Sequence, residues 1–148
     1  PAATELWTPE LLGAPLPPAA APPTRRHNEQ RYLEARELMN RRPPDYAAAL
    51  RLFQANIFET PNAEDIDFDF VNAALCCARL EQCDEARDYY MLIARRFANG
   101  TRNWRKELDE VKGVIAQSSD PACQRALKSV NSADKPVGSG ETGVNRTP

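Results

Sequence analysis

The sequence has very little histidine, with His27 as the only one among 148 residues. His27 adjoins a Pro-rich stretch, so a Cys-His or Ser-His nucleophile pair would need that stretch to reach into a folded domain. The cysteines number only four, and the adjoining Cys76 and Cys77 cannot form the CxxC pair of a zinc knuckle. We therefore predict that the chain is not an enzyme and has no cofactor and no metal site.

The sequence also lacks an excess of charge of either sign. Nineteen Lys and Arg residues face 21 Asp and Glu residues, which gives a net charge of −2, and the two signs are interleaved. A general nucleic-acid binder needs a basic surface, so this class is not expected. Long apolar runs are missing as well. No window approaches the roughly 18 to 20 apolar residues of a bilayer span, and no transmembrane segment is predicted.

The two ends lack the composition of a folded domain. Residues 1–23 hold seven of the 13 prolines and little charge, which predicts an extended tether. Residues 131–148 hold three of the six glycines and no aromatic residue, which predicts a disordered tail. One folded domain is expected between them, over residues 24–130, and about 100 residues suffice for a core of its own.

The tether contains an apolar motif in an otherwise Pro-Ala spacer. Such a segment resembles a short linear docking motif, which would contact a groove of this domain or anchor another protein. A merely exposed segment is the other interpretation. The residues of the motif are Leu6, Trp7, Leu11 and Leu12.

The start of the chain bears on its location. It begins at Pro1 without Met, and a Pro-rich tether there suits a mature exported protein, such as a bacterial lipoprotein without its acylated Cys. An arbitrary boundary of the sequence explains the same start. Of the two, we favour a periplasmic or outer-membrane-tethered protein over a cytoplasmic one.

Between the ends, apolar residues recur every three or four positions in segments rich in Ala, Leu, Arg and Glu. This pattern predicts an all-α fold of six helices. The first is expected from about Thr24, as N-cap, to Asn40, with Leu33, Ala35 and Leu38 on its buried side. The other starts are expected at the cap Asp45, after the turns 62–65 and 81–84, after Thr101, and at the cap Asp120 for a short sixth helix.

An acidic run, Glu64 to Asp69, lies at the start of the third helix. It lacks the glycine and the terminal Glu that a calcium loop needs. Carboxylates at a helix start interact favourably with the helix dipole. A solvated helix start is therefore predicted.

Two stretches within residues 28–98 place small and large apolar residues at the positions of a repeated helical hairpin. The residues are Tyr46, Ala49, Phe53 and Pro61 in the first stretch, and Phe70, Ala73, Ala74, Cys77, Ala86 and Tyr90 in the second. Both stretches resemble the tetratricopeptide repeat family. The resemblance implies tandem antiparallel helical hairpins in a superhelix, with the last two helices as a capping element. Ala49 and Ala86 stand 37 residues apart, rather than the family's 34. The alternative is a non-repeating helix bundle.

The resemblance also implies a concave groove, lined by the first helix of each hairpin. It places Tyr32, Arg36, Met39, Val71, Asn72, Leu75 and Arg79 on that wall. The guanidinium and amide donors among them would suit a peptide carboxylate. The other interpretation is that they are ordinary solvated residues.

These observations favour a non-enzymatic adaptor or assembly factor whose groove binds a peptide or helix of another protein. By analogy with the family, it would serve a bacterial cell-envelope or secretion complex. The alternative is a self-associating structural subunit that exchanges residues 1–12 as a strap. A disulfide between Cys83 and Cys123 would fasten the last helix if the chain is exported, and small buried thiols are the other interpretation.

Overall fold

The computed structural model describes residues 25–134, and all regular secondary structure in this range is helical. The all-α prediction is confirmed. The predicted tether with its apolar motif, and residues 135–148 of the predicted tail, lie outside the described residues. Residues 131–133, which were assigned to the tail, belong to the last helix instead. The helices are α3 (Glu29–Asn40), α4 (Tyr46–Glu59), α5 (Ile66–Arg79), α6 (Cys83–Arg96), α7 (Arg105–Ala116) and α8 (Pro121–Ala133).

Side chains cap three of the helix starts. Asp45 accepts a hydrogen bond from the Ala48 N–H, and Asp120 accepts one from the Ala122 N–H, as expected for α4 and α8. The prediction for the first helix was wrong, because α3 begins at Glu29 and not near Thr24. Its N-cap is Asn28, whose side chain accepts a hydrogen bond from the Arg31 N–H.

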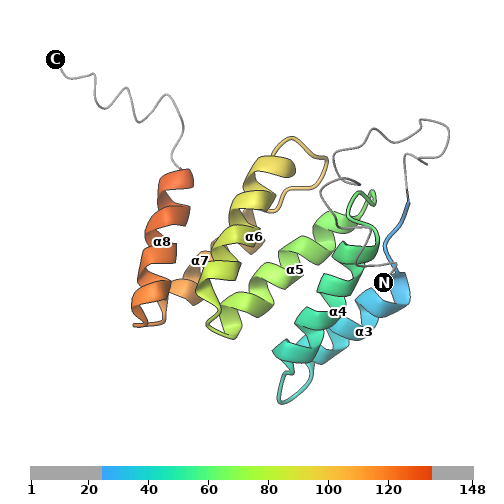
Figure 1. Ribbon diagram of the computed structural model, residues 1–148, viewed down its shortest axis with the longest axis horizontal. Helices are drawn as coiled ribbons and strands as arrows, with labels where there is room; N and C mark the ends of the chain where they lie inside the picture. Colours follow the sequence, from blue (N-terminus) through green and yellow to red (C-terminus); the bar gives the residue numbers. More distant parts are fainter. Residues whose placement is uncertain (1–24, 135–148) are drawn as a thin grey trace, which may run out of the picture.

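The helices pair into hairpins along the chain, and the hairpins lie in a row with α3 and α4 at one end and α8 at the other (Figure 1). The first hairpin packs on the second through α4 and α5. The second packs on the last through α5 against α7 and α6 against α8. The expected capping element is thus itself a hairpin, and α8, expected to be short, has 13 residues.

Helix α5 lies at the centre of the domain, with α4, α6 and α7 packed around it. All of its residues are buried except Phe68 and Arg79. The chain leaves it through Glu81, whose φ of 59° lies in the left-handed region, and the Gln82 N–H closes the turn on the Cys77 carbonyl at 2.8 Å. This burial on every side makes α5 the core of the fold.

One prediction about the buried side of α3 was wrong. Leu33 is 55% exposed, whereas Ala35 is fully buried and Leu38 is half-buried. The helix packs on α4 along one narrow stripe, and Tyr32 and Met39 join that contact instead of Leu33.

The cysteines divide into two kinds. A disulfide joins Cys83, at the start of α6, to Cys123 in α8, the pair considered from the sequence. Cys76 and Cys77 are free thiols within α5 and are fully buried, and burial raises the pKa of each to about 12. They are therefore inert at neutral pH. Within residues 25–134, no helix combines the length and apolar character needed to cross a bilayer.

Candidate peptide-binding surface

Three of the residues predicted for the groove wall meet in one polar network between α3 and α5. Arg36 Nη1 donates to Asn72 Oδ1 at 2.8 Å. The Asn72 amide donates to the Phe68 carbonyl at 2.8 Å and reaches the Tyr32 hydroxyl at 3.4 Å. These bonds fix the Arg36 guanidinium at the joint between the first two hairpins, because Asn72 is itself 97% buried.

The remaining predicted wall residues lie elsewhere. Val71 and Leu75 are 1% and 7% exposed, so they belong to the core and offer no open surface. Met39 is half-buried against the same core. Arg79 is exposed and pairs with Glu110 of α7 at 3.7 Å, and its position is seven residues, or about 10 Å, further along α5 than Asn72. The open part of the predicted wall is therefore confined to the half-buried Tyr32, Arg36 and Met39, with Arg79 standing apart.

A row of three half-buried aromatic rings extends from Tyr32 across the starts of the three hairpins. The ring centroids of Tyr32 and Phe68 lie 6.0 Å apart, and those of Phe68 and Trp104 lie 5.1 Å apart, both edge to face. Tyr32 is in α3, Phe68 in α5, and Trp104 is the residue before α7. We call these three residues the aromatic row.

Sequence reasoning missed Phe68 and Trp104 as members of one surface. The signal was present, because the steps from residue 32 to 68 and from 68 to 104 are both 36 residues. A strict search for equally spaced aromatic residues would have found the third hairpin as well as the row.

Arg102 adds a second guanidinium to this surface. Its Cζ lies 4.6 Å from the centre of the Phe68 ring, which is a cation–π contact. Two of its nitrogens reach the two Asp67 carboxylate oxygens at 2.7 Å, and Trp104 Nε1 donates to the same carboxylate at 2.9 Å. Burial alone would raise the pKa of Asp67, but the bonds from Arg102 and Trp104 lower it below its usual value. The carboxylate thus anchors the segment before α7 on α5.

The three aspartates of the acidic run are not solvated, contrary to prediction, whereas Glu64 is exposed as predicted. Asp65, Asp67 and Asp69 are 4%, 5% and 0% exposed, and each has partners far away in the sequence. Local sequence could not show this, because those partners lie 35 to 42 residues from them.

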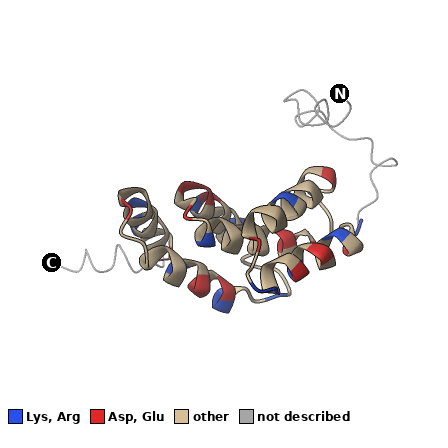
Figure 2. Cartoon of the chain, turned by 90° about the horizontal axis from the view of Figure 1, so that it is seen from below, with Lys and Arg blue, Asp and Glu red and all other residues tan. Residues whose placement is uncertain are grey.

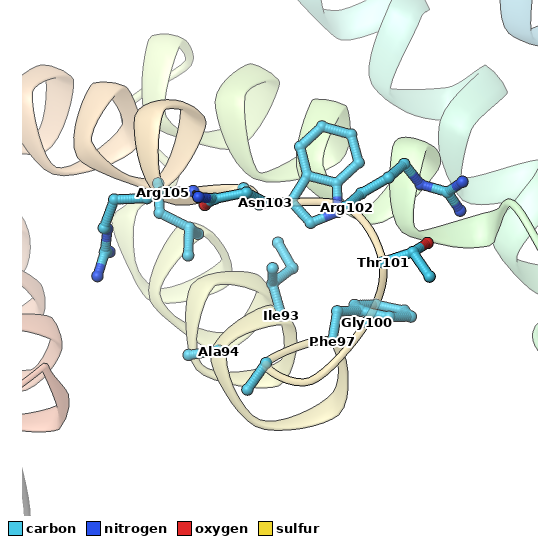
Figure 3. A pocket seen from close by; sticks show the side chains of 11 residues that line it. Ile93, Ala94, Phe97, Gly100, Thr101, Arg102, Asn103 and Arg105 are labelled. Atoms are coloured by element: carbon cyan, nitrogen blue, oxygen red, sulfur yellow. The ribbon is translucent and has the colours of Figure 1, made fainter.

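A hollow of about 460 Å³ lies beside Trp104, between the end of α6 and the start of α7 (Figure 3). Ile93, Phe97 and Leu108 provide apolar lining, and Arg105 lies at the start of α7. Its volume falls in the range of small-molecule or side-chain pockets. The hollow therefore extends the row with a place for an apolar side chain.

Within residues 25–134, the charged residues elsewhere on the surface form no large patch of one sign. Figure 2 shows Lys and Arg interleaved with Asp and Glu along the helices. The guanidinium groups beside the aromatic row therefore act locally, through contact, and not through a long-range field.

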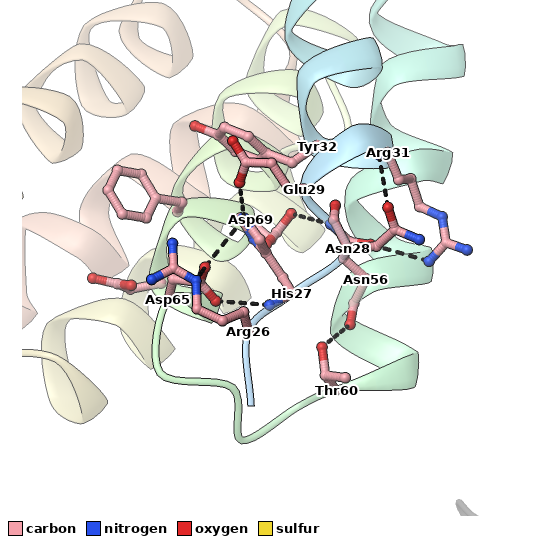
Figure 4. A network of polar contacts seen from close by, with 12 residues as sticks. Arg26, His27, Asn28, Glu29, Arg31, Tyr32, Asn56, Thr60, Asp65 and Asp69 are labelled. Atoms are coloured by element: carbon pink, nitrogen blue, oxygen red, sulfur yellow. Dashed lines mark hydrogen bonds and ion pairs between the residues drawn. The ribbon is translucent and has the colours of Figure 1, made fainter. Parts of the chain in front are cut away.

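His27 was expected only to adjoin the Pro-rich stretch, but it is buried in the domain and only 5% exposed. Its ring stacks on Tyr32 with centroids 4.8 Å apart, and its backbone N–H donates to Asp65 Oδ1 at 2.8 Å. Ring atom Nδ1 is hydrogen-bonded to Asp69 (Figure 4). Nε2 faces the carboxylates of Glu29 and Asp65, rather than the hydroxyl or thiol of a nucleophile.

The described residues therefore define a domain of tandem helical hairpins with an aromatic and arginine surface at the hairpin starts. Comparisons with family models, with curated proteins and with solved structures match nothing to this chain. The resemblance to the tetratricopeptide repeat stays a prediction.

Proposed function

We propose that the chain is a non-enzymatic protein-binding module that holds a peptide or helix against the aromatic row. The observation that carries this proposal is the row itself, in which the half-exposed rings of Tyr32, Phe68 and Trp104 are flanked by Arg36 and Arg102. An aromatic surface that is only half covered in the free domain is a natural contact for another chain.

The chemistry of the row favours a protein ligand of defined character. Tyr, Trp and Arg are enriched at protein interfaces, because rigid rings bury much apolar area at little cost in conformational entropy. A guanidinium pairs well with a carboxylate. The ligand we propose therefore combines apolar side chains, which cover the rings, with an acidic side chain or a C-terminal carboxylate beside Arg36.

The broader role is that of an adaptor or assembly factor. Its placement in a bacterial cell-envelope or secretion complex rests on the family resemblance and on the tether predicted for residues 1–23. A periplasmic or membrane-tethered location would agree with the Cys83–Cys123 disulfide, since disulfides persist in oxidising compartments.

A charge-removing substitution tests the surface. Peptides would be selected from a random display library on the full chain, and their affinities measured by fluorescence anisotropy. We expect acidic and apolar peptides, and a loss of about tenfold in affinity for Arg36→Gln, because a hydrogen bond to a charged group contributes roughly 1.5 kcal/mol or more. Gln retains an amide donor for Asn72, which preserves the fold.

Arg51→Gln is the matched control, since Arg51 is an exposed arginine of the same hairpin on α4. Equal losses for the two variants, or a library without any enriched peptide, would contradict the proposal.

Self-association is the competing function. Light scattering of the full chain and of a chain without residues 1–23 distinguishes the two. An oligomer that is lost on truncation would favour the exchanged strap, whereas a monomer in both cases would remove it.

A further inference from the structure

Three side chains from two parts of the sequence converge at the edge of the first hairpin (Figure 4). His27 Nε2 lies 3.2 Å from Glu29 Oε1 and 3.4 Å from Asp65 Oδ2. One atom from each of the three residues thus falls within 4.8 Å of the other two. His27 and Asp65 are buried, whereas the Glu29 side chain is 61% exposed and leaves one side open to solvent.

A further carboxylate, that of Asp69, orients the His27 imidazole through its other ring nitrogen. Its Nδ1 is hydrogen-bonded to Asp69, which is fully buried and also accepts from the Asn56 amide at 3.0 Å. An Nδ1–H that donates to a carboxylate leaves the Nε2 lone pair free. A hydrogen bond from Nδ1 to a carboxylate is the usual arrangement of a metal-binding histidine, because it fixes the tautomer and makes Nε2 a better ligand.

The charge around Nε2 is unbalanced. Nε2 faces one oxygen of Glu29 at 3.2 Å and one of Asp65 at 3.4 Å, and a cation between these three atoms would balance the two carboxylates. Glu29, Asp65 and Asp69 are three acidic side chains around the imidazole, and Arg26 is the arginine that contacts Asp65. Arg102 also interacts electrostatically with Asp65, but its ion pair is with Asp67. Arg26 Nε lies 3.1 Å from Asp65 Oδ2, but its side chain is 72% exposed and free to turn outward.

The Asp65 carboxylate gives independent support. Its Oδ1 is engaged by the His27 backbone, but among the described residues its buried Oδ2 accepts no well-oriented hydrogen bond, despite the nearby Arg26 and His27 nitrogens. The side chain is only 6% exposed, and a buried carboxylate oxygen that accepts no well-oriented hydrogen bond is costly. Oδ2 points toward the space that Nε2 and Glu29 also face.

We infer that His27, Glu29 and Asp65 form a binding site for a divalent transition metal of the zinc kind. Ligands at about 2.0–2.1 Å from a tetrahedral zinc ion lie roughly 3.3 Å from one another, close to the two distances from Nε2. One nitrogen and two carboxylate oxygens suit this class of metal, and the exposed side leaves a fourth position for water. The ion would join the segment before α3 to the start of α5.

The test uses the full chain, freed of metal with EDTA and labelled with ¹⁵N, and Zn²⁺ alone as the probe. Because the chain has a single histidine, its imidazole nitrogen signals are assigned without ambiguity. We expect one equivalent of Zn²⁺ to shift the Nε2 signal strongly, while Nδ1 remains protonated. Co²⁺ in place of Zn²⁺ should give the visible absorption of a four-coordinate site.

Glu29→Gln is the informative variant, because the exposed side chain can change without loss of the fold. It should weaken Zn²⁺ binding by tenfold or more, since even an outer-shell partner contributes about 10- to 100-fold in affinity. Glu34→Gln, an exposed position on the same helix, should bind as the wild type does. Imidazole signals that stay unchanged in excess Zn²⁺, or equal affinities of the two variants, would overturn the inference. It does not depend on the proposed peptide-binding function.

Discussion

The two ends of the domain are fastened by different chemistry. At the first hairpin, the His27 network, which comprises His27, Asn56, Asp65 and Asp69, joins the segment before α3 to α4 and α5. At the last hairpin, the Cys83–Cys123 disulfide joins α6 to α8. Both span a similar stretch of sequence, since His27 and Asp69 are 42 residues apart and the two cysteines 40.

Because of this difference, the network affects the free energy of the folded chain, whereas the disulfide mainly affects that of the unfolded chain. A hydrogen-bonded network exists only in the folded chain and must offset the cost of taking its charges out of water. A disulfide persists after unfolding and, in the chain-entropy account, stabilises mainly by restricting the unfolded chain. The first hairpin should therefore be sensitive to single side chains, and the last hairpin to the redox state.

The largest effect is expected from Asp69→Ala. The substitution leaves the His27 ring and the Asn56 amide without their buried acceptor, and each buried polar group left unsatisfied costs about 1–3 kcal/mol. Urea denaturation in the presence of EDTA would measure the loss in the free energy of unfolding.

Asp88→Ala on α6 is its control, because that side chain is 71% exposed and pairs only with neighbouring Arg87 among the described residues. We expect a change within about 0.5 kcal/mol there. An Asp69→Ala loss as small as the control's would show that the network contributes nothing to stability.

The next largest effect is expected from the disulfide. Replacing both cysteines by Ala removes a cross-link over 40 residues and should lower the free energy of unfolding by about 2–4 kcal/mol. Dithiothreitol should destabilise the wild type by a similar amount and leave the double variant unchanged. If the reductant had no effect on the wild type, the disulfide would contribute nothing to the stability of the domain.

The smallest effect concerns a polar contact at the disulfide end. Asp134 accepts from Lys112 Nζ at 2.8 Å and from the Tyr90 hydroxyl. Burial alone would raise the pKa of Asp134, but these bonds lower it below its ordinary value. The stabilisation is therefore present above the unfolded pKa of about 3.9 and is lost as the pH falls through the lower folded pKa.

Asp134→Asn should accordingly cost up to about 1 kcal/mol at pH 7, and the difference from the wild type should shrink at pH 3. Urea denaturation at the two pH values provides the measurement. A difference that is equal at both would assign the effect to something other than the carboxylate charge.

Features of the fold could be predicted from the sequence where the interacting groups lie within a few residues of each other in the chain. The caps Asp45 and Asp120 act on backbone within three residues, and they marked two helix starts correctly. Thr24 and Asn28 are both suitable caps, and only the structure shows that Asn28 is used. The exposure of Leu33 likewise depends on where α4 lies, which no local pattern contains.

The candidate site was predicted in part, for the same reason. The family resemblance led to Tyr32 and Arg36, but it placed Val71 and Leu75 on an open wall, although α5 is covered on that side by α7. The partners of the acidic run were beyond any local rule, because pairs such as Asp67 with Arg102 form only once the hairpins are stacked.

The central position of α5 has a consequence for the domain as a whole. Because α4, α6 and α7 all rest on this one helix, no hairpin carries a core of its own. Opening α5 would remove the surface against which each neighbour packs. The three hairpins are repeated in form, yet we expect them to melt together as a single cooperative unit, with the amide hydrogens of α5 the last to exchange with solvent.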